Sequence, residues 1–131
     1  MEPSEINENK DFSSQNMWNS FMHAFSGIAI LFKSQKNARI HIVILVLVIV
    51  AGIILRISAV QWIAVALVSG LVIAAESFNT AVEILCNIVM PEYNQGIRKV
   101  KDLSAAGVLV SAVTAAVTGL FVFIPAILRI L

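Results

Sequence analysis

Residues 59–87 read AVQWIAVALVSGLVIAAESFNTAVEILCN and join an apolar run to a polar stripe. The apolar run, 59–75, would cover roughly 25 Å as a helix rising 1.5 Å per residue, which is most of a hydrocarbon core about 30 Å thick. We therefore expect Glu76, the residue directly after this run, to lie near one membrane surface, where lipid headgroups meet water. Spacings of three, four and four residues place the polar side chains on one helix face. They are Glu76, Asn79, Glu83 and Asn87.

The composition is that of an integral membrane protein. Of 131 residues, 59% are hydrophobic and 13% are charged, and the mean hydropathy is +0.89. An ordinary soluble domain carries about 25% charged residues. The formal charge of +1 and the dispersed basic residues argue against a nucleic-acid partner. The single cysteine, Cys86, excludes a disulfide within the chain and a cysteine-based metal site.

The pattern predicts an all-α fold with one amphipathic surface helix and three transmembrane helices. Residues 16–34 place aromatic and aliphatic side chains on one face and polar side chains on the other, so we expect this helix to lie in the membrane interface. Packing against protein alone is the alternative. The expected spans are 40–57, 59–89 and 101–128. We expect a disordered tail at 1–14 and one domain at 15–131.

Basic residues predict the orientation. Six of them flank one side of the expected spans and two flank the other. The positive-inside rule then places the surface helix and the polar stripe in the cytoplasmic half of a multi-pass protein. The six are Lys33, Lys36, Arg39, Arg98, Lys99 and Lys101, and the two are Arg56 and Arg129.

The last expected span carries small residues spaced by three and four. Such a seam lets another helix approach closely, so we interpret it as a packing face. Its members are Ser104, Gly107, Ser111, Thr114 and Thr118.

Two carboxylates of the stripe are candidates for chemistry. An intramembrane glutamate is by default a functional hypothesis, and Glu76 could accept a hydroxyl proton. Glu83, with Lys101 and Asp102, would suit a phosphate substrate bound with Mg²⁺. The alternative for Lys101 and Asp102 is an interface anchor and a helix-start acid.

Other site types have weaker support. The sequence has no glycine-rich phosphate loop, so nucleotide binding does not follow from a motif. His23 and His41 are isolated, and we interpret them as interfacial or packing residues.

Three segments together resemble the prokaryotic diacylglycerol kinase family, which includes the undecaprenol kinases. They are ESFNTAVE at 76–83, PEY at 91–93 and KDLSAA at 101–106. The resemblance implies a surface helix with three membrane helices per subunit, and a homotrimer whose active sites are shared between chains. It also implies a lipid alcohol substrate, ATP as the phosphoryl donor and Mg²⁺ as the cofactor.

The resemblance further implies a role for each matching residue. Glu76 would be the general base on the lipid hydroxyl, and Glu83 a Mg²⁺ ligand. The nucleotide site would include Asn79, Glu83, Lys101 and Asp102, with Glu92 and Tyr93 in a loop that touches the nucleotide.

Two positions depart from the family pattern. The family usually has a second metal-binding glutamate where this chain has Gln35, and an aspartate where it has Asn87. An amide oxygen can still coordinate Mg²⁺, but it brings no negative charge.

The leading hypothesis is therefore an ATP- and Mg²⁺-dependent kinase that phosphorylates diacylglycerol or undecaprenol. Gln35 and Asn87 favour a second hypothesis, a non-catalytic membrane protein that retains the kinase fold. Glu76 alone would also permit a third, an ion- or proton-conducting subunit.

Overall fold

The computed structural model describes residues 14–131, and it confirms the all-α fold. The predicted tail lies outside the described residues except for Ser14, which begins the first helix. The helices are α1 (Ser14–Ser34), α2 (Lys36–Ile54), α3 (Ala59–Val89) and α4 (Gln95–Leu128).

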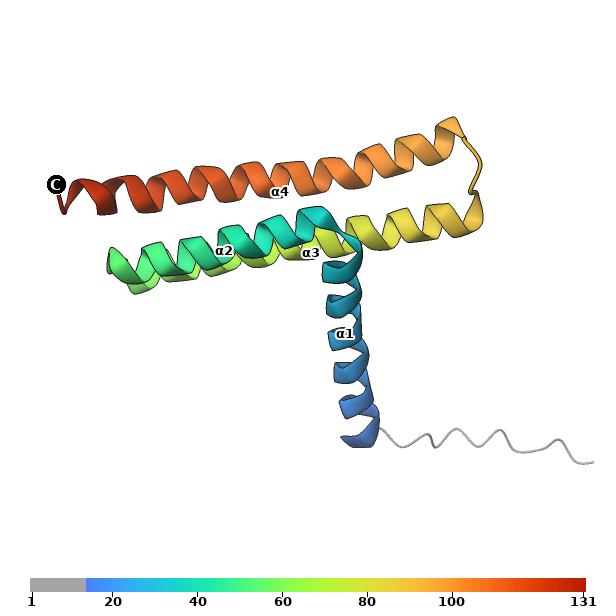
Figure 1. Cartoon of the computed structure of the whole chain (residues 1–131), viewed down its shortest axis with the longest axis horizontal. Helices are drawn as coiled ribbons and strands as arrows, with labels where there is room; N and C mark the ends of the chain where they lie inside the picture. The colour runs from blue at the N-terminus through green and yellow to red at the C-terminus, as the bar shows by residue number, and fades with distance from the viewer. Residues whose placement is uncertain (1–13) are drawn as a thin grey trace, which may run out of the picture.

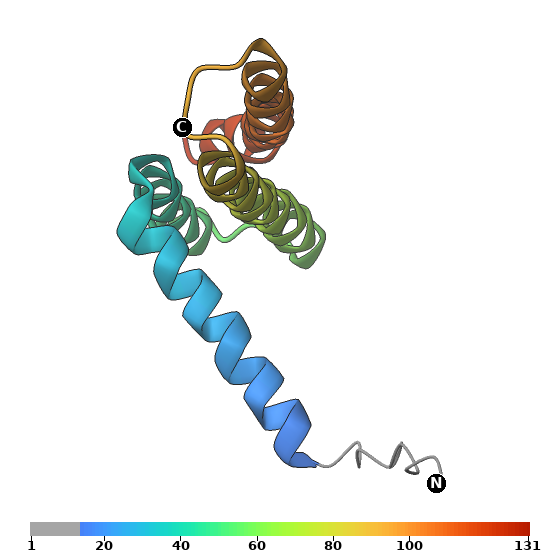
Figure 2. The same cartoon turned by 90° about the vertical axis from the view of Figure 1, so that its right-hand side faces the viewer.

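Three helices run side by side and the first one leaves them at a steep angle (Figures 1 and 2). By length and composition, α2, α3 and α4 can each cross a membrane. The antiparallel pair of α3 and α4 forms the most extensive contact, and α2 packs mainly along α3. The predicted three spans are thus confirmed.

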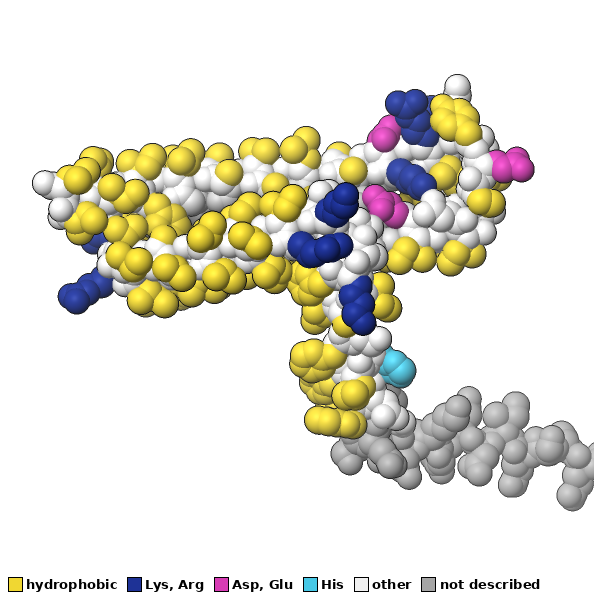
Figure 3. Space-filling model, viewed as in Figure 1, with side chains coloured by type: hydrophobic (Ala, Val, Ile, Leu, Met, Phe, Trp, Pro, Cys, Tyr) yellow, Lys and Arg dark blue, Asp and Glu magenta, His cyan; other side chains and the backbone are white. Residues whose placement is uncertain are grey.

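The amphipathic character of α1 is visible on its surface. Its large apolar side chains are exposed, and Figure 3 shows them gathered on the side of α1 that faces along the spans. Lys, Arg, Asp and Glu cluster where α1 joins the bundle, while few charges lie at the opposite end. This is the geometry of a helix that rests on a membrane surface while the remaining helices cross the membrane. The exposed apolar residues of α1 include Met17, Trp18, Phe21, Met22, Phe25 and Ile28.

The helix that contains the start of the first predicted span, 40–57, begins four residues before it. A single extended residue, Gln35, separates α1 from α2, so α2 already begins at Lys36. Hydropathy marks where lipid contact begins, whereas the helix continues through the polar first turn before it.

The helix that contains the third predicted span, 101–128, likewise begins before it, at Gln95. The side chain of Asn94 accepts hydrogen bonds from the backbone N–H groups of Gly96, at 2.8 Å, and Ile97, at 3.2 Å. This cap satisfies two otherwise unpaired donors at the helix start, so α4 begins in the polar segment.

The helix α2 ends at Ile54, three residues before the predicted end of the first span at 57. The chain turns at Arg56, whose φ of 50° is left-handed. Ser58 and Gln61 then form a reciprocal capping box that starts α3. α3 has the predicted bounds.

The small-residue seam of α4 divides between two directions. Ser111 is buried and Ser104 is half-buried, whereas Gly107 and Thr114 are exposed. Thr118 is also half-buried, so three of the five seam residues are at least partly covered within the chain and two face outward.

The end of the bundle far from α1 holds its small apolar core, in which Ile57, Val65, Val122 and Ala126 pack together. Beside it, the ring of Trp62 covers Gly52 of α2. A β-carbon on Gly52 would lie 2.7 Å from Trp62 Cη2 and 3.1 Å from Ile57 Cδ1. Only glycine fits this approach of α2 to α3.

We predict that Gly52→Ala destabilises the protein by about 1–3 kcal/mol, because the added methyl group overpacks the contact with Trp62. The measurement is the apparent melting temperature in detergent. Gly70→Ala is the matched control, because a β-carbon at Gly70 meets nothing within 4 Å. Equal melting temperatures for the two variants would contradict the packing role of Gly52.

Candidate active site

A chain of hydrogen bonds connects three segments near the junction of α1 and α2. Gln35 Nε2 donates to Glu83 Oε2 at 3.2 Å, and Asn79 Nδ2 donates to Glu83 Oε1 at 3.2 Å. Ser104 Oγ of α4 in turn donates to Asn79 Oδ1 at 2.6 Å. Both oxygens of Glu83 thus accept hydrogen bonds, from the α1–α2 junction and from α3, and α4 joins the network through Asn79.

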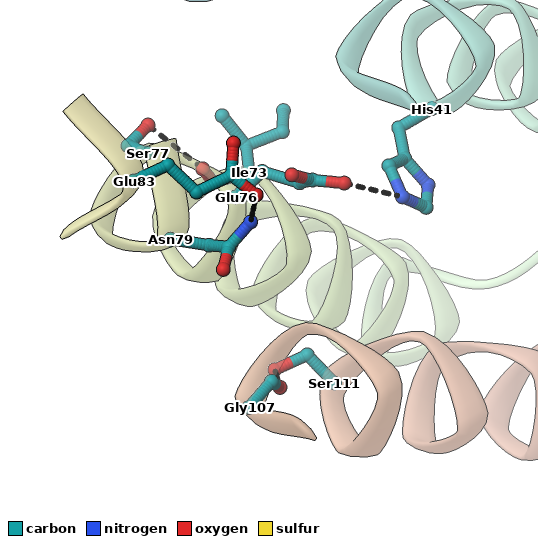
Figure 4. A network of polar contacts seen from close by, with 8 residues as sticks. All are labelled: His41, Ile73, Glu76, Ser77, Asn79, Glu83, Gly107 and Ser111. Carbon is teal, nitrogen blue, oxygen red and sulfur yellow. Dashed lines mark hydrogen bonds and ion pairs between the residues drawn. The ribbon is translucent and has the colours of Figure 1, made fainter. Parts of the chain in front are cut away.

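Glu76 lies two turns before Glu83 on α3 and is only 2% exposed. Its carboxylate points toward α2, where His41 Nε2 lies 3.4 Å from Glu76 Oε1 (Figure 4). The contact is a close approach of ion-pair length, but it lacks hydrogen-bond geometry. Within residues 14–131, neither Glu76 Oε1 nor the neighbouring Thr80 Oγ1 has a hydrogen-bond partner, although both atoms are buried. Unpaired buried oxygens of this kind are costly.

The end of the predicted stripe engages α4. Lys101 Nζ donates to Asn87 Oδ1 at 2.7 Å, so the lysine does lie at the same end of the bundle as the two carboxylates. The four residues of the stripe share one helix but have different partners. Asn79 and Glu83 bond to each other, Glu76 faces α2, and Asn87 faces α4.

The remaining predicted site residues are not joined to this network. Asp102 pairs with Arg98 at 3.7 Å on the exposed side of α4. Glu92 and Tyr93 lie in the loop between α3 and α4, where the Tyr93 side chain is 77% exposed. Their assignment to the nucleotide site stays a prediction.

The donor set around Glu83 bears on the predicted magnesium. Within the described residues, no three His, Cys, Asp or Glu side chains gather closely enough to hold a metal ion. Mg²⁺ usually binds proteins through one or two carboxylates and completes its shell with water and substrate phosphates. Glu83 supplies one carboxylate, and the amides of Gln35 and Asn79 carry further oxygens. In this structure both amides direct their N–H groups at Glu83, and the Asn79 oxygen accepts from Ser104. A Mg²⁺ ion that arrives with a phosphate ligand would need Glu83 to exchange these hydrogen bonds for the metal.

An apolar cavity of about 270 Å³ lies between α2, α3 and α4. Its lining runs from His41 on α2, Ile73 on α3 and Ala112 on α4 to Val65 and Phe123 nearer the opposite end. Apart from His41 and Ser69, every lining residue is apolar or glycine. His41 is therefore a polar group at the end of the cavity closest to Glu76.

The contact of His41 with Glu76 was not predicted from the sequence, where His41 was interpreted as an interfacial or packing residue. A signal did exist. His41 lies at the start of the first apolar span, and Glu76 lies at the end of the apolar run 59–75. Both residues should therefore lie near the same membrane surface. The sequence alone did not show that these two helices pack against each other with His41 facing Glu76.

The fold and the site define a small membrane protein with a surface helix, three spans and two glutamates held at its charged end. The family model described as prokaryotic diacylglycerol kinase matches residues 22–123. A diacylglycerol kinase of Synechocystis sp. is 32% identical over 117 residues, covering 88% of this chain and 67% of the relative. An undecaprenol kinase of Bacillus subtilis is 28% identical over 106 residues, covering 81% and 86%.

The chain belongs to the prokaryotic diacylglycerol kinase family. It is a membrane-embedded lipid kinase.

We predict that Ser104→Ala destabilises the protein by about 1–3 kcal/mol, because it leaves the largely buried Asn79 oxygen without a donor. The measurement is again the apparent melting temperature in detergent. Ser77→Ala is the control, since Ser77 is exposed and bonds only to the carbonyl of Ile73 in its own helix. If both variants melt alike, the link from α4 to Asn79 contributes nothing to stability.

Proposed function

We propose that this lipid kinase transfers the γ-phosphoryl group of ATP, bound with Mg²⁺, to the hydroxyl of a membrane lipid alcohol, either diacylglycerol or undecaprenol. The observation that carries the proposal is the buried carboxylate of Glu76. Its contact residue His41 lines the apolar cavity between the spans, and Glu76 itself lies two turns from a second, hydrogen-bonded glutamate. Glu76, close to the apolar cavity, would serve the lipid alcohol. Glu83, in the polar network, would serve the phosphate donor.

In the proposed reaction, the lipid hydroxyl approaches Glu76 from the membrane side. Its oxygen forms a bond to the γ-phosphorus while the bond from that phosphorus to the β,γ-bridging oxygen breaks. The hydroxyl proton passes to the Glu76 carboxylate, and ADP leaves with the bridging oxygen. Positioning and charge stabilisation dominate catalysis of this reaction type.

Glu83 would hold the Mg²⁺ of the nucleotide, with oxygens of Gln35 and Asn79 beside it. When bound, the ion neutralises part of the charge on the phosphates. Lys101 adds a cation at the same end of the bundle. Its ammonium group already lies at the α3–α4 face through its bond to Asn87. Asp102, Glu92 and Tyr93 are proposed at the outer part of the nucleotide site.

The charge distribution supports a cytoplasmic location for the site in a bacterial inner membrane. The six basic residues named above flank α1, the start of α2 and the start of α4, which are at the same end as Glu83. The two exposed residues of the α4 seam, Gly107 and Thr114, support assembly into a homo-oligomer, for which a trimer is proposed from the family resemblance.

The test is incubation of the detergent-purified protein with labelled ATP, Mg²⁺ and each lipid alcohol in turn. We expect phosphorylated lipid, whose identity names the substrate. Glu76→Gln should lower the turnover by at least about 100-fold, because an amide cannot accept the hydroxyl proton.

Ser77→Ala, the neighbouring exposed position, is the control and should keep the unmodified rate. Turnover near the unmodified level in Glu76→Gln would refute the base assignment. Complete lack of labelled lipid with the unmodified protein would favour the non-catalytic alternative.

We further predict that Gln35→Glu lowers the Mg²⁺ concentration needed for half-maximal turnover by about 3- to 10-fold. The new carboxylate would sit at the position from which Gln35 now contacts Glu83, and a second carboxylate strengthens binding of a hard cation. The measurement is the initial rate against Mg²⁺ at fixed ATP.

Gln95→Glu adds the same charge at the start of α4, away from Glu83, and serves as the matched control. An unchanged Mg²⁺ requirement in Gln35→Glu would count against Gln35 lying beside the ion.

A further inference from the structure

The burial of Glu76 raises a question that the proposed reaction leaves open. A general base must present one carboxylate oxygen to its substrate in a fixed direction, yet within residues 14–131 no hydrogen bond fixes the Glu76 carboxylate. By contrast, Glu83 on the same helix has both oxygens bonded. Some other group must orient Glu76.

The imidazole of His41 approaches this carboxylate from another helix, α2. Nε2 of His41 lies 3.4 Å from Oε1 of Glu76, and Figure 4 shows the ring directed across the space between α2 and α3 toward the carboxylate. The His41 side chain is 23% exposed and the Glu76 side chain 3% exposed. The imidazole thus reaches the carboxylate from the more open side of the contact. A small adjustment of either side chain would turn this approach into a hydrogen bond. Catalytic contacts often tighten in this way when substrate binds.

The position of His41 is also tied to the rest of the site. His41 lies in the second turn of α2, and Gln35 directly before α2 bonds to Glu83. The beginning of α2 therefore contacts both glutamates of α3. His41 also borders the apolar cavity at the end nearest Glu76.

We propose that His41 is a positioning residue for Glu76. Its Nε2–H engages Oε1 and leaves Oε2 directed toward the lipid hydroxyl, so that the base is aligned by α2 instead of by its own helix. This role rests on the proposed function. It does not require His41 to touch the lipid or the nucleotide.

The test compares two substitutions at position 41 in the full-length protein. His41→Leu removes the donor and keeps an apolar side chain suited to a spanning helix. His41→Gln keeps an N–H donor of similar reach. The pair His23→Leu and His23→Gln, at an exposed position of α1, provides matched controls.

We expect His41→Leu to lower kcat for the lipid alcohol by about 10- to 100-fold, the scale on which a misdirected catalytic group reduces a rate. The KM for ATP and the dissociation constant of ATP with Mg²⁺, measured without lipid, should change less than about twofold, since Glu83 and its partners are untouched. His41→Gln should recover most of the lost kcat. Both His23 variants should behave like the unmodified protein.

The outcomes separate this role from a structural one. Loss of kcat in His41→Leu and His41→Gln alike, or a matching loss of ATP affinity and of apparent melting temperature, would show that His41 only supports packing. Unchanged kcat in His41→Leu, with an active unmodified protein, would overturn the positioning role and leave the proposed function intact. Absence of turnover in the unmodified protein and in both His23 variants would overturn the proposed function, and this role with it.

Discussion

A carboxylate removed from water must find a partner, and this constraint organises the charged end of the bundle. Glu76 is enclosed between α3 and α2, and His41 is the residue that α2 brings to it. The cost of burying an isolated charge is large, so two helices that carry these residues have a reason to meet at this level and in this register. The apolar contacts elsewhere between α2 and α3 are generic by comparison, since lipid chains are as apolar as the side chains they would replace.

Glu83 is stabilised differently, by hydrogen bonds to both of its carboxylate oxygens. It lies in a wetter region and is held by two amides, one from its own helix and one from the α1–α2 junction. Ser104 extends the network to α4. Through these hydrogen bonds, Glu83 is linked to the α1–α2 junction, to α3 and, by way of Asn79, to α4. The two glutamates of α3 thus differ in kind. Glu76 is buried with His41 in contact but without a hydrogen bond, whereas both oxygens of Glu83 accept hydrogen bonds.

Much of the fold followed from the sequence, because hydropathy and helical periodicity report directly on lipid contact. The span 59–89 was predicted with its observed bounds, since Ser58 and Pro91 mark its ends chemically. The starts of α2 and α4 were not predicted, because Lys36 and Gln95 begin helices in polar segments where hydropathy has no signal. In the site, the shared face of Glu76, Asn79 and Glu83 was predictable from spacing along one helix. The contact with His41 was not, because it depends on how two helices pair in space.

The single residue between α1 and α2 has a mechanical consequence. Gln35 is the single residue between the two helices, and it also donates a hydrogen bond to Glu83. A change in the depth or tilt of α1 would therefore act on the start of α2 and on the Glu83 hydrogen bond through the same residue.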